Sequence, residues 1–184
     1  MNYIIKPAVT LFVTAVITIA ALSVVYNLTL EPIERQIQRT QEAALRAVLP
    51  GAEEFRLIEA ETPGSIVAVY EGLTGGVLVG YVVELSPAGY GGTIDLVAGI
   101  SVPDERITGM RILRHSETPG LGALAARENF YQRFDNRPLV PLEVVRYSPG
   151  EHQISAITSS TITTRAVTGA VNEAIRWFNG RDGR

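Results

Sequence analysis

A run of hydroxyl-bearing residues in the last quarter of the sequence has the chemistry of an anion site. The run Thr158-Ser159-Ser160-Thr161-Ile162-Thr163-Thr164 stands immediately before a stretch whose apolar residues recur at helical spacing. The first amides of a helix have no acceptor within the helix, and the helix dipole makes that end positive, so a phosphate near these hydroxyls would be stabilised. Ser and Thr are also the preferred helix caps, and simple capping is the alternative explanation of the run.

A second candidate segment is the turn-rich passage 115–122, which leaves an expected strand and enters an expected helix. Gly120 and Gly122 allow the backbone to approach a ligand closely, while Glu117 and Thr118 offer side chains that can hydrogen-bond to one. A capped turn containing a satisfied polar histidine is the alternative explanation.

A third segment, Gly89-Tyr90-Gly91-Gly92, places glycines on both sides of one aromatic residue. A flexible hairpin connection explains it as well as a ligand site does. Tyr90 would then either stack on a ring or fill the core. Taken alone, none of the three segments identifies a function.

The composition argues against several classes of function. The chain has no cysteine and only two histidines, His115 and His152, so it is poorly supplied for iron–sulfur ligation, for a metal cluster or for a Ser-His-Asp hydrolase, and no G-x-S-x-G motif occurs. Its net charge is −3 and its only lysine is Lys6, which leaves no dense basic patch for a phosphate backbone. Nucleic acid is therefore not an expected partner.

The elements that must position these segments begin with a membrane span. Residues 7–30 carry no charge, and as a helix they extend about 36 Å, more than the roughly 30 Å of the hydrocarbon core. A cleaved signal peptide is the alternative, but its apolar region is shorter, about 7–15 residues. Lys6 precedes the span while Glu31 and Glu34 follow it, near Arg35, which predicts that residues 1–6 are cytoplasmic and that the domain after the span is extracytoplasmic.

An amphipathic helix over residues 31–50, with Pro32 at its start, is predicted to connect the span to a single domain, residues 51–184. Segments bounded by Gly, Pro, Thr or Ser predict strands in that domain at 55–59, 66–70, 77–85, 94–101 and 106–113. Helices are expected at 122–134 and 162–178, and residues 140–147 are ambiguous. This order predicts an α+β fold with a mostly antiparallel sheet and packing helices.

Together the three segments resemble the FMN-binding domain shared by the G subunit of Rnf-type ferredoxin:NAD oxidoreductases and the C subunit of sodium-translocating NADH:quinone reductases. The resemblance covers nearly the whole chain: an N-terminal span, the G-Y-G-G passage, H-x-E-T-P-G-L-G at 115–122 and a terminal S/T-G-A-T-like motif followed by a helix. In that family the threonine that ends the motif is esterified to the FMN phosphate. The resemblance therefore implies covalent FMN on Thr161.

The same resemblance implies the other site residues and the partners. The candidates for contact with FMN are Tyr90, Glu117, Thr118, Gly120, Leu121, Gly122, Ser159, Ser160 and Ile162. A threonine hydroxyl is a poor nucleophile and the sequence shows no adjacent base, so attachment would need a separate enzyme. The family resemblance implies that this enzyme is an FAD-dependent flavin transferase. The flavin supplies the redox chemistry, and no residue of the chain needs to act as a catalytic acid or base.

The implied function is that of an electron-transfer subunit anchored in the cytoplasmic membrane of a bacterium or archaeon. Its partners would be the other subunits of a complex that couples ferredoxin and NAD to ion movement. The chain departs from the family pattern, which usually has Gly and Ala where Ser159 and Ser160 stand and an acidic residue where Ser155 stands.

Three other functions compete with this one. Within the family, the alternative is the C subunit of the quinone reductase, and the compact length without long insertions favours the Rnf-type protein. From another class, the chain could be a membrane-anchored binding module without flavin. An anchored hydrolase is the least favoured, because no nucleophile motif accompanies His115 or His152.

Overall fold

The computed structural model describes residues 2–58, 64–147 and 149–181. The chain forms two compact units, Met1–Thr40 and Gln41–Arg184. The described residues of the first unit are all helical, and the second unit is a folded α+β domain.

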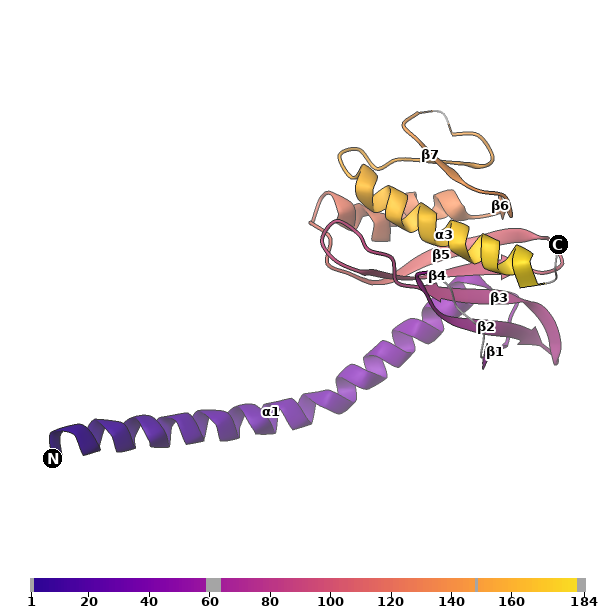
Figure 1. Ribbon diagram of the computed structural model, residues 1–184. Helices are drawn as coiled ribbons and strands as arrows, with labels where there is room; N and C mark the ends of the chain where they lie inside the picture. Colours follow the sequence, from indigo (N-terminus) through magenta and orange to yellow (C-terminus); the bar gives the residue numbers. More distant parts are fainter. Residues whose placement is uncertain (1, 59–63, 148, 182–184) are drawn as a thin grey trace. The chain divides into compact units, whose positions relative to one another are not determined.

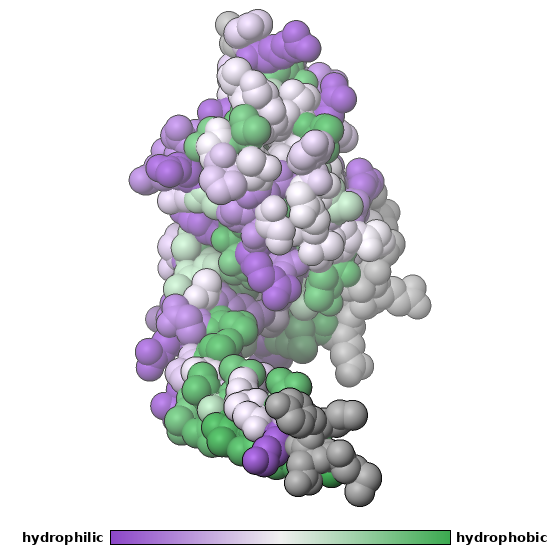
Figure 2. All heavy atoms as spheres, turned by 90° about the vertical axis from the view of Figure 1, so that its left-hand side faces the viewer, coloured by the Kyte–Doolittle hydropathy of each residue, from purple (hydrophilic) through white to green (hydrophobic). Residues whose placement is uncertain are grey.

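The first unit is most of helix α1, which runs from Asn2 to Val48 without interruption. Its apolar stretch is long enough to cross a membrane and is not buried by the rest of the chain. Figure 2 shows these hydrophobic side chains gathered on α1. Pro32 lies inside α1, so the prediction of a helix start at this residue is wrong. A proline costs a helix interior about 3 kcal/mol, and α1 nonetheless continues through Pro32.

The second unit is built on a six-stranded antiparallel sheet in which each strand pairs with its neighbours in sequence. The strands are β1 (Glu54–Ile58), β2 (Ile66–Thr74), β3 (Val77–Leu85), β4 (Ile94–Ser101), β5 (Arg106–His115) and β6 (Arg137–Pro138). A separate parallel pair consists of β7 (Glu143–Val145) and β8 (Gln153–Ser155). Helix α3 (Thr161–Arg181) crosses the sheet (Figure 1). The predicted α+β class is confirmed.

Both faces of the sheet are covered, because successive side chains of a strand point to opposite faces. In β4, Leu96, Ala98 and Ile100 belong to a core that includes the buried side chains of α3. Val97 belongs to a second core, which includes the last turns of α1. All four side chains are fully buried. The sheet is therefore the middle layer of the domain, with α3 on one face and the end of α1 on the other.

The end of α1 packs closely on a stripe of glycines that crosses four strands. Gly72 pairs with Gly80 across β2 and β3, and Gly99 pairs with Gly109 across β4 and β5. A Cβ atom on Gly80 would lie 2.8 Å from Cδ1 of Leu49, and one on Gly99 would overlap the carbonyl oxygen of Val48. That carbonyl accepts a hydrogen bond from Thr108 Oγ1. The glycines thus let the backbone of α1 approach the backbone of the sheet.

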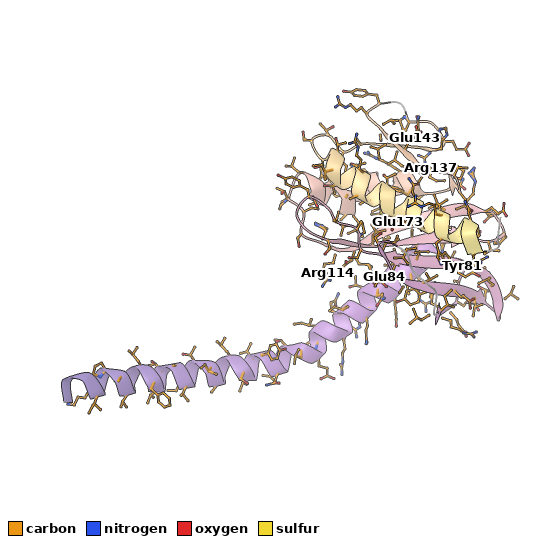
Figure 3. All side chains as sticks on the ribbon, viewed as in Figure 1. Tyr81, Glu84, Arg114, Arg137, Glu143 and Glu173 are labelled. Atoms are coloured by element: carbon orange, nitrogen blue, oxygen red, sulfur yellow. The ribbon has the colours of Figure 1, made fainter. Side chains whose placement is uncertain are left out.

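A polar cluster lies on the same face. Nε2 of Gln41 donates to the Tyr70 hydroxyl at 2.9 Å and to Oε2 of Glu84 at 3.0 Å, and the Tyr70 hydroxyl donates to the same oxygen at 3.2 Å. Burial and the neighbouring charge of Glu84, labelled in Figure 3, raise the pKa of Tyr70 above its ordinary value. The residues of α1 from Gln41 onward are therefore part of the domain.

The local structure differs from the sequence prediction in several places. Strand β2 continues to Thr74, beyond the predicted 66–70, and β5 continues to His115, beyond the predicted 106–113. Residues 122–134, expected as one helix, form η1 (Gly122–Ala126), α2 (Glu128–Tyr131) and η2 (Gln132–Phe134), with a break at Arg127, whose backbone is extended (φ −89°, ψ 151°). The ambiguous segment 140–147 contains β7, and the short strands β6 and β8 were not predicted. The expected strand 55–59 is described as far as Ile58, and Glu59 lies outside the described residues.

Candidate functional site

The three segments singled out in the sequence meet at the start of α3. Residues from the loop 89–92, from the turn 115–122 and from the start of α3 line one cavity of about 450 Å³. The lining residues are Tyr90, Glu117, Leu121, Gly122, Ser159, Ser160, Thr161, Ile162 and Thr163. In Figure 1 the start of α3 is its left-hand end.

Thr161 is the first residue of α3, and its side chain is half-buried in the wall of this cavity. The amide of Thr164 donates to the carbonyl of Ser160 at 3.0 Å, which closes the first turn. Within the described chain, the amides of Thr161, Ile162 and Thr163 donate to no protein atom. Such free amides, together with the helix dipole, favour an anion at this end of the helix.

Ser159 has the backbone conformation of a glycine, with φ at +64°. This left-handed region costs a residue with a side chain roughly 1–2 kcal/mol and costs glycine almost nothing. The resemblance described above places glycine at this position in the family. The unusual serine therefore keeps the backbone path that the motif requires, at a conformational cost.

Glu117 joins the other two segments to α3. Its side chain is only 6% exposed. Oε1 accepts hydrogen bonds from the amides of Tyr90 at 2.7 Å and Gly91 at 3.0 Å. Oε2 accepts one from Oγ1 of Thr163 at 2.8 Å. One carboxylate thus fastens the loop 89–92 to the first turn of α3.

Glycines make room for this carboxylate. A Cβ atom on Gly122 would overlap Oε2 of Glu117, and one on Gly89 would overlap Oε1. One on Gly91 would overlap the carbonyl oxygen of Ser116. The glycines of the two motifs therefore bring the segments together around Glu117, rather than only giving the loops flexibility.

The carboxyl group of Glu117 is held in its ionised form. Burial alone would raise its pKa, but the hydrogen bonds from Gly91, Thr163 and Tyr90 and the charge of His115 outweigh burial, and the pKa is lowered below the ordinary value of 4.5. Hydrogen bonds to the charged form of a carboxylate always act in this direction.

We expect Glu117 to give the domain an acid-sensitive part of its stability. Because the folded-state pKa is depressed, this contribution is complete above pH 4.5 and is lost as the pH falls through the lower folded-state value. Charge-assisted hydrogen bonds exceed neutral ones by about 1 kcal/mol, so Glu117→Gln should lower stability by about that amount at pH 7. Chemical unfolding of the detergent-solubilised chain at a series of pH values would show the two proteins converging in acid.

The matched control for this experiment is Glu53→Gln, which changes an exposed glutamate. It should leave the acid dependence of the wild type unchanged. If Glu117→Gln kept the full acid dependence of the wild type, the assignment of this stability to Glu117 would be wrong.

Three large apolar side chains remain exposed at the rim of the cavity. Tyr90 is 72% exposed, Leu121 42% and Ile162 58%. Each comes from a different one of the three segments, and each lines the cavity. An apolar rim above free amides suits a ligand with a flat apolar part and an anionic part.

Most of the residues singled out in the sequence line the cavity, but Thr118 and Gly120 do not. Thr118 acts through its backbone, since its carbonyl oxygen accepts from the amides of Leu121 at 3.1 Å and Ala123 at 3.2 Å. Gly120 has φ at +78°, so it serves the turn. Thr163 is the lining residue that the sequence prediction missed. It belongs to the hydroxyl run, but no sequence signal pairs it with Glu117, 46 residues away.

Comparisons with known proteins bear on both units. The family model described as "FMN-binding domain" matches residues 89–176. This range contains all three segments of the site. The family model described as "RnfG N-terminal region" matches residues 1–48, which correspond to α1.

Curated relatives match almost the whole chain. The G subunit of an ion-translocating oxidoreductase complex from Methanosarcina acetivorans is 33% identical, over 97% of this chain and 96% of that protein. The G subunit of the Na⁺-translocating ferredoxin:NAD⁺ oxidoreductase complex from Acetobacterium woodii is 34% identical, over 94% of this chain and 90% of that protein.

A solved structure shows the same fold at lower identity. The crystal structure of the C subunit of the Na⁺-translocating NADH-quinone reductase from Parabacteroides distasonis superposes with a TM-score of 0.59 at 17% identity, over 80% of this chain and 96% of that one. This similarity supports the fold alone, whereas the curated relatives cover nearly the full length at higher identity. The chain therefore belongs to the family of the G subunits of ion-translocating oxidoreductase complexes, and its folded unit is an FMN-binding domain.

Proposed function

We propose that this chain carries FMN through a phosphoester bond to Oγ1 of Thr161. We further propose that it transfers electrons as a membrane-anchored component of an ion-translocating ferredoxin:NAD oxidoreductase complex. The observation that carries the proposal is the position of Thr161. It is the first residue of α3 and lines the cavity, and the first three amides of this helix have no protein acceptor. The names of the curated relatives support the electron-transfer role.

The charges of the site suit FMN bound as a phosphodiester of Thr161 better than free FMN, which is a phosphate monoester. None of the residues that line the described cavity is a lysine or an arginine. Arg165 lies one turn further along α3 and is exposed. A free phosphate monoester with up to two negative charges would meet only the helix amides, whereas a phosphodiester carries one charge. The bond to Thr161, rather than a set of cations, would hold the cofactor.

The apolar rim suits the ring system of the flavin. Tyr90, Leu121 and Ile162 would contact its faces or edges, and the buried Glu117 would keep the loop that carries Tyr90 in place. Bound FMN would supply the acceptance and donation of electrons, while the protein positions it and excludes water from part of its surface. The chain needs no acid, base or nucleophile for this role.

Attachment would require a separate enzyme. The only carboxylate that lines the described cavity is that of Glu117, and both of its oxygens already accept hydrogen bonds. No group in the cavity wall is therefore free to remove the proton of Thr161. A flavin transferase that uses FAD would form the bond between the Thr161 oxygen and phosphorus. It would break the pyrophosphate bond of FAD and release AMP and the hydroxyl proton.

Helix α1 supports a location of the domain at the membrane surface. Among the described residues α1 has an apolar stretch of spanning length, which would anchor the chain in the membrane. The partners of the chain would be the other subunits of the oxidoreductase complex. The position of Lys6 before the apolar stretch and of Glu31 and Glu34 after it supports an extracytoplasmic domain. Covalent attachment would then also prevent loss of FMN outside the cytoplasm.

The first test is the intact mass of the full chain after co-expression with a flavin transferase. The wild type should gain the mass of one FMN less one water, and its yellow colour should survive denaturation. Thr161→Ala should gain nothing, because the acceptor oxygen is gone. Thr40→Ala is the control, since Thr40 is an exposed threonine outside the motif that does not line the cavity, and it should be modified as fully as the wild type.

Two outcomes would contradict the proposal. Modification of Thr161→Ala would place the flavin on another residue. A colourless and unmodified wild type, under conditions in which a known flavinylated protein is modified, would favour an anchored binding module without flavin.

A further inference from the structure

The carboxylate of Glu117 is a fixed charge in the wall of the cavity. It accepts three hydrogen bonds, and all three donors are neutral: two backbone amides and one hydroxyl. Among the described residues, no arginine or lysine forms a salt bridge with it. The neighbouring His115 accepts a hydrogen bond through Nδ1 from the amide of Glu117, at 3.2 Å. The carboxylate is thus solvated by neutral donors, and His115 is the one charged neighbour that contributes to the lowering of its pKa.

The surroundings keep this charge in place and effective. Glu117 is almost fully buried, so water screens it less than it screens a surface glutamate. Gly122 and Gly89 leave no space between their backbones and the two carboxylate oxygens. The lowered pKa agrees with a group that stays ionised at neutral pH. Any ligand in the cavity would therefore experience a permanent negative charge from one wall.

We propose that Glu117 is a positioning residue with a second role, in which its buried carboxylate lowers the reduction potential of a flavin held in this cavity. The inference rests on the function proposed above, because it requires FMN at Thr161. The positioning role follows from the bonds to Tyr90, Gly91 and Thr163, and the second role follows from the charge.

The direction of the effect follows from the charges of the two redox forms. When the flavin ring takes up two electrons and one proton, it gains one negative charge. The carboxylate of Glu117 repels this added charge, so it raises the free energy of the reduced form relative to the oxidised form. Removing the charge should therefore favour reduction and raise the potential.

The test is the two-electron midpoint potential of the flavinylated full chain at pH 7, measured for the wild type and for Glu117→Gln. Glutamine has the same shape and keeps an oxygen for the amides of Tyr90 and Gly91, so the loop should stay in place. We expect the ratio of reduced to oxidised flavin, measured at a fixed ambient potential, to rise roughly tenfold in Glu117→Gln. For a two-electron couple this ratio corresponds to an upward shift of the midpoint potential by about 30 mV.

The matched control is Glu173→Gln. Glu173 also lies on the domain, where it accepts hydrogen bonds from the amide and the hydroxyl of Ser65 at 2.6 and 2.7 Å. It is twelve residues beyond Thr161 on α3, about 18 Å along the helix (Figure 3). Its substitution removes the same charge from a similar set of donors, and the potential should not move.

A second variant separates charge from position. Thr163→Val removes the hydrogen bond to Oε2 but leaves the carboxylate in the structure. If the potential depends on the charge, Thr163→Val should not reproduce the upward shift of Glu117→Gln. If both variants raise the potential equally, the hydrogen-bond geometry around Glu117 is responsible and the second role is wrong.

The outcomes for the two proposals remain distinguishable. Intact mass is measured first, and a wild type without covalent FMN contradicts the function proposed for the chain. A flavinylated wild type whose potential equals that of flavinylated Glu117→Gln leaves that function intact and overturns the role proposed for Glu117.

Discussion

A fragment that begins at Gly51 is expected not to fold, whereas a fragment that begins at Gln41 is expected to fold as a water-soluble domain. The shorter fragment lacks Leu45, Val48 and Leu49, which are at most 5% exposed. Burial of such side chains contributes about 1.5–3 kcal/mol each, and their sum approaches the 5–15 kcal/mol by which a whole domain is typically stable. Thermal unfolding followed by near-ultraviolet circular dichroism would compare the two fragments.

The longer fragment is the matched control, since it restores only ten residues and none of the apolar stretch. It also restores Gln41 and its hydrogen bonds to Tyr70 and Glu84. A cooperative unfolding transition in the fragment 51–184 would show that the second core is dispensable. Failure of both fragments would show that the domain needs more of α1 than its last turns.

The substitution Gly99→Ala is expected to be among the most destabilising single changes in the domain. The added methyl group would overlap the carbonyl oxygen of Val48 and lie 2.8 Å from its carbonyl carbon. These are backbone atoms, so no side chain can rotate away, and α1 or β4 must shift. Overpacking of this kind costs typically 1–3 kcal/mol and occasionally more, and we expect about 3 kcal/mol here. Urea unfolding of the fragment 41–184 would measure the loss.

Gly169→Ala supplies the control for this prediction. A Cβ atom on Gly169, inside α3, would meet no heavy atom within 4 Å. Alanine forms helices better than glycine, so this variant should gain up to about 1 kcal/mol. Equal stabilities of Gly99→Ala and the wild type would mean that α1 does not approach the sheet as closely as the structure shows.

Much of the domain can be predicted from local sequence signals. The β-branched residues of 77–85 and 94–101 give the strand bounds correctly, because both strands are central in the sheet and most of their residues are buried. The start of α3 is predicted within one residue, because the hydroxyl run supplies a helix terminus and the apolar repeat follows at once. Short strands such as β6 and β8 carry too few residues to show a period.

Other features depend on contacts that the sequence does not display. A proline such as Pro32 predicts a helix boundary, and only the structure shows that α1 continues through it. The motif glycines indicate flexible loops in the sequence, while the structure shows that Gly89 and Gly122 pack against the carboxylate of Glu117. The bond between Glu117 and Thr163 is likewise a tertiary contact across the chain. The sequence prediction names most of the residues that line the cavity, but it does not show that the acidic residue among them, Glu117, is an internal anchor.

The order of the elements along the chain determines which face of the sheet can be covered first during synthesis. The end of α1 is made first, and β1 to β5 follow as hairpins that pair with the strand just made. Such pairing between strands that are adjacent in sequence closes only short loops, which favours fast formation. One face of the sheet can therefore be covered early, whereas the other waits for Val167, Val171 and Ile175 of α3. The helix that begins with Thr161 is the last large element to be made, so we expect the cavity proposed as the flavin site to be the last part of the domain to form.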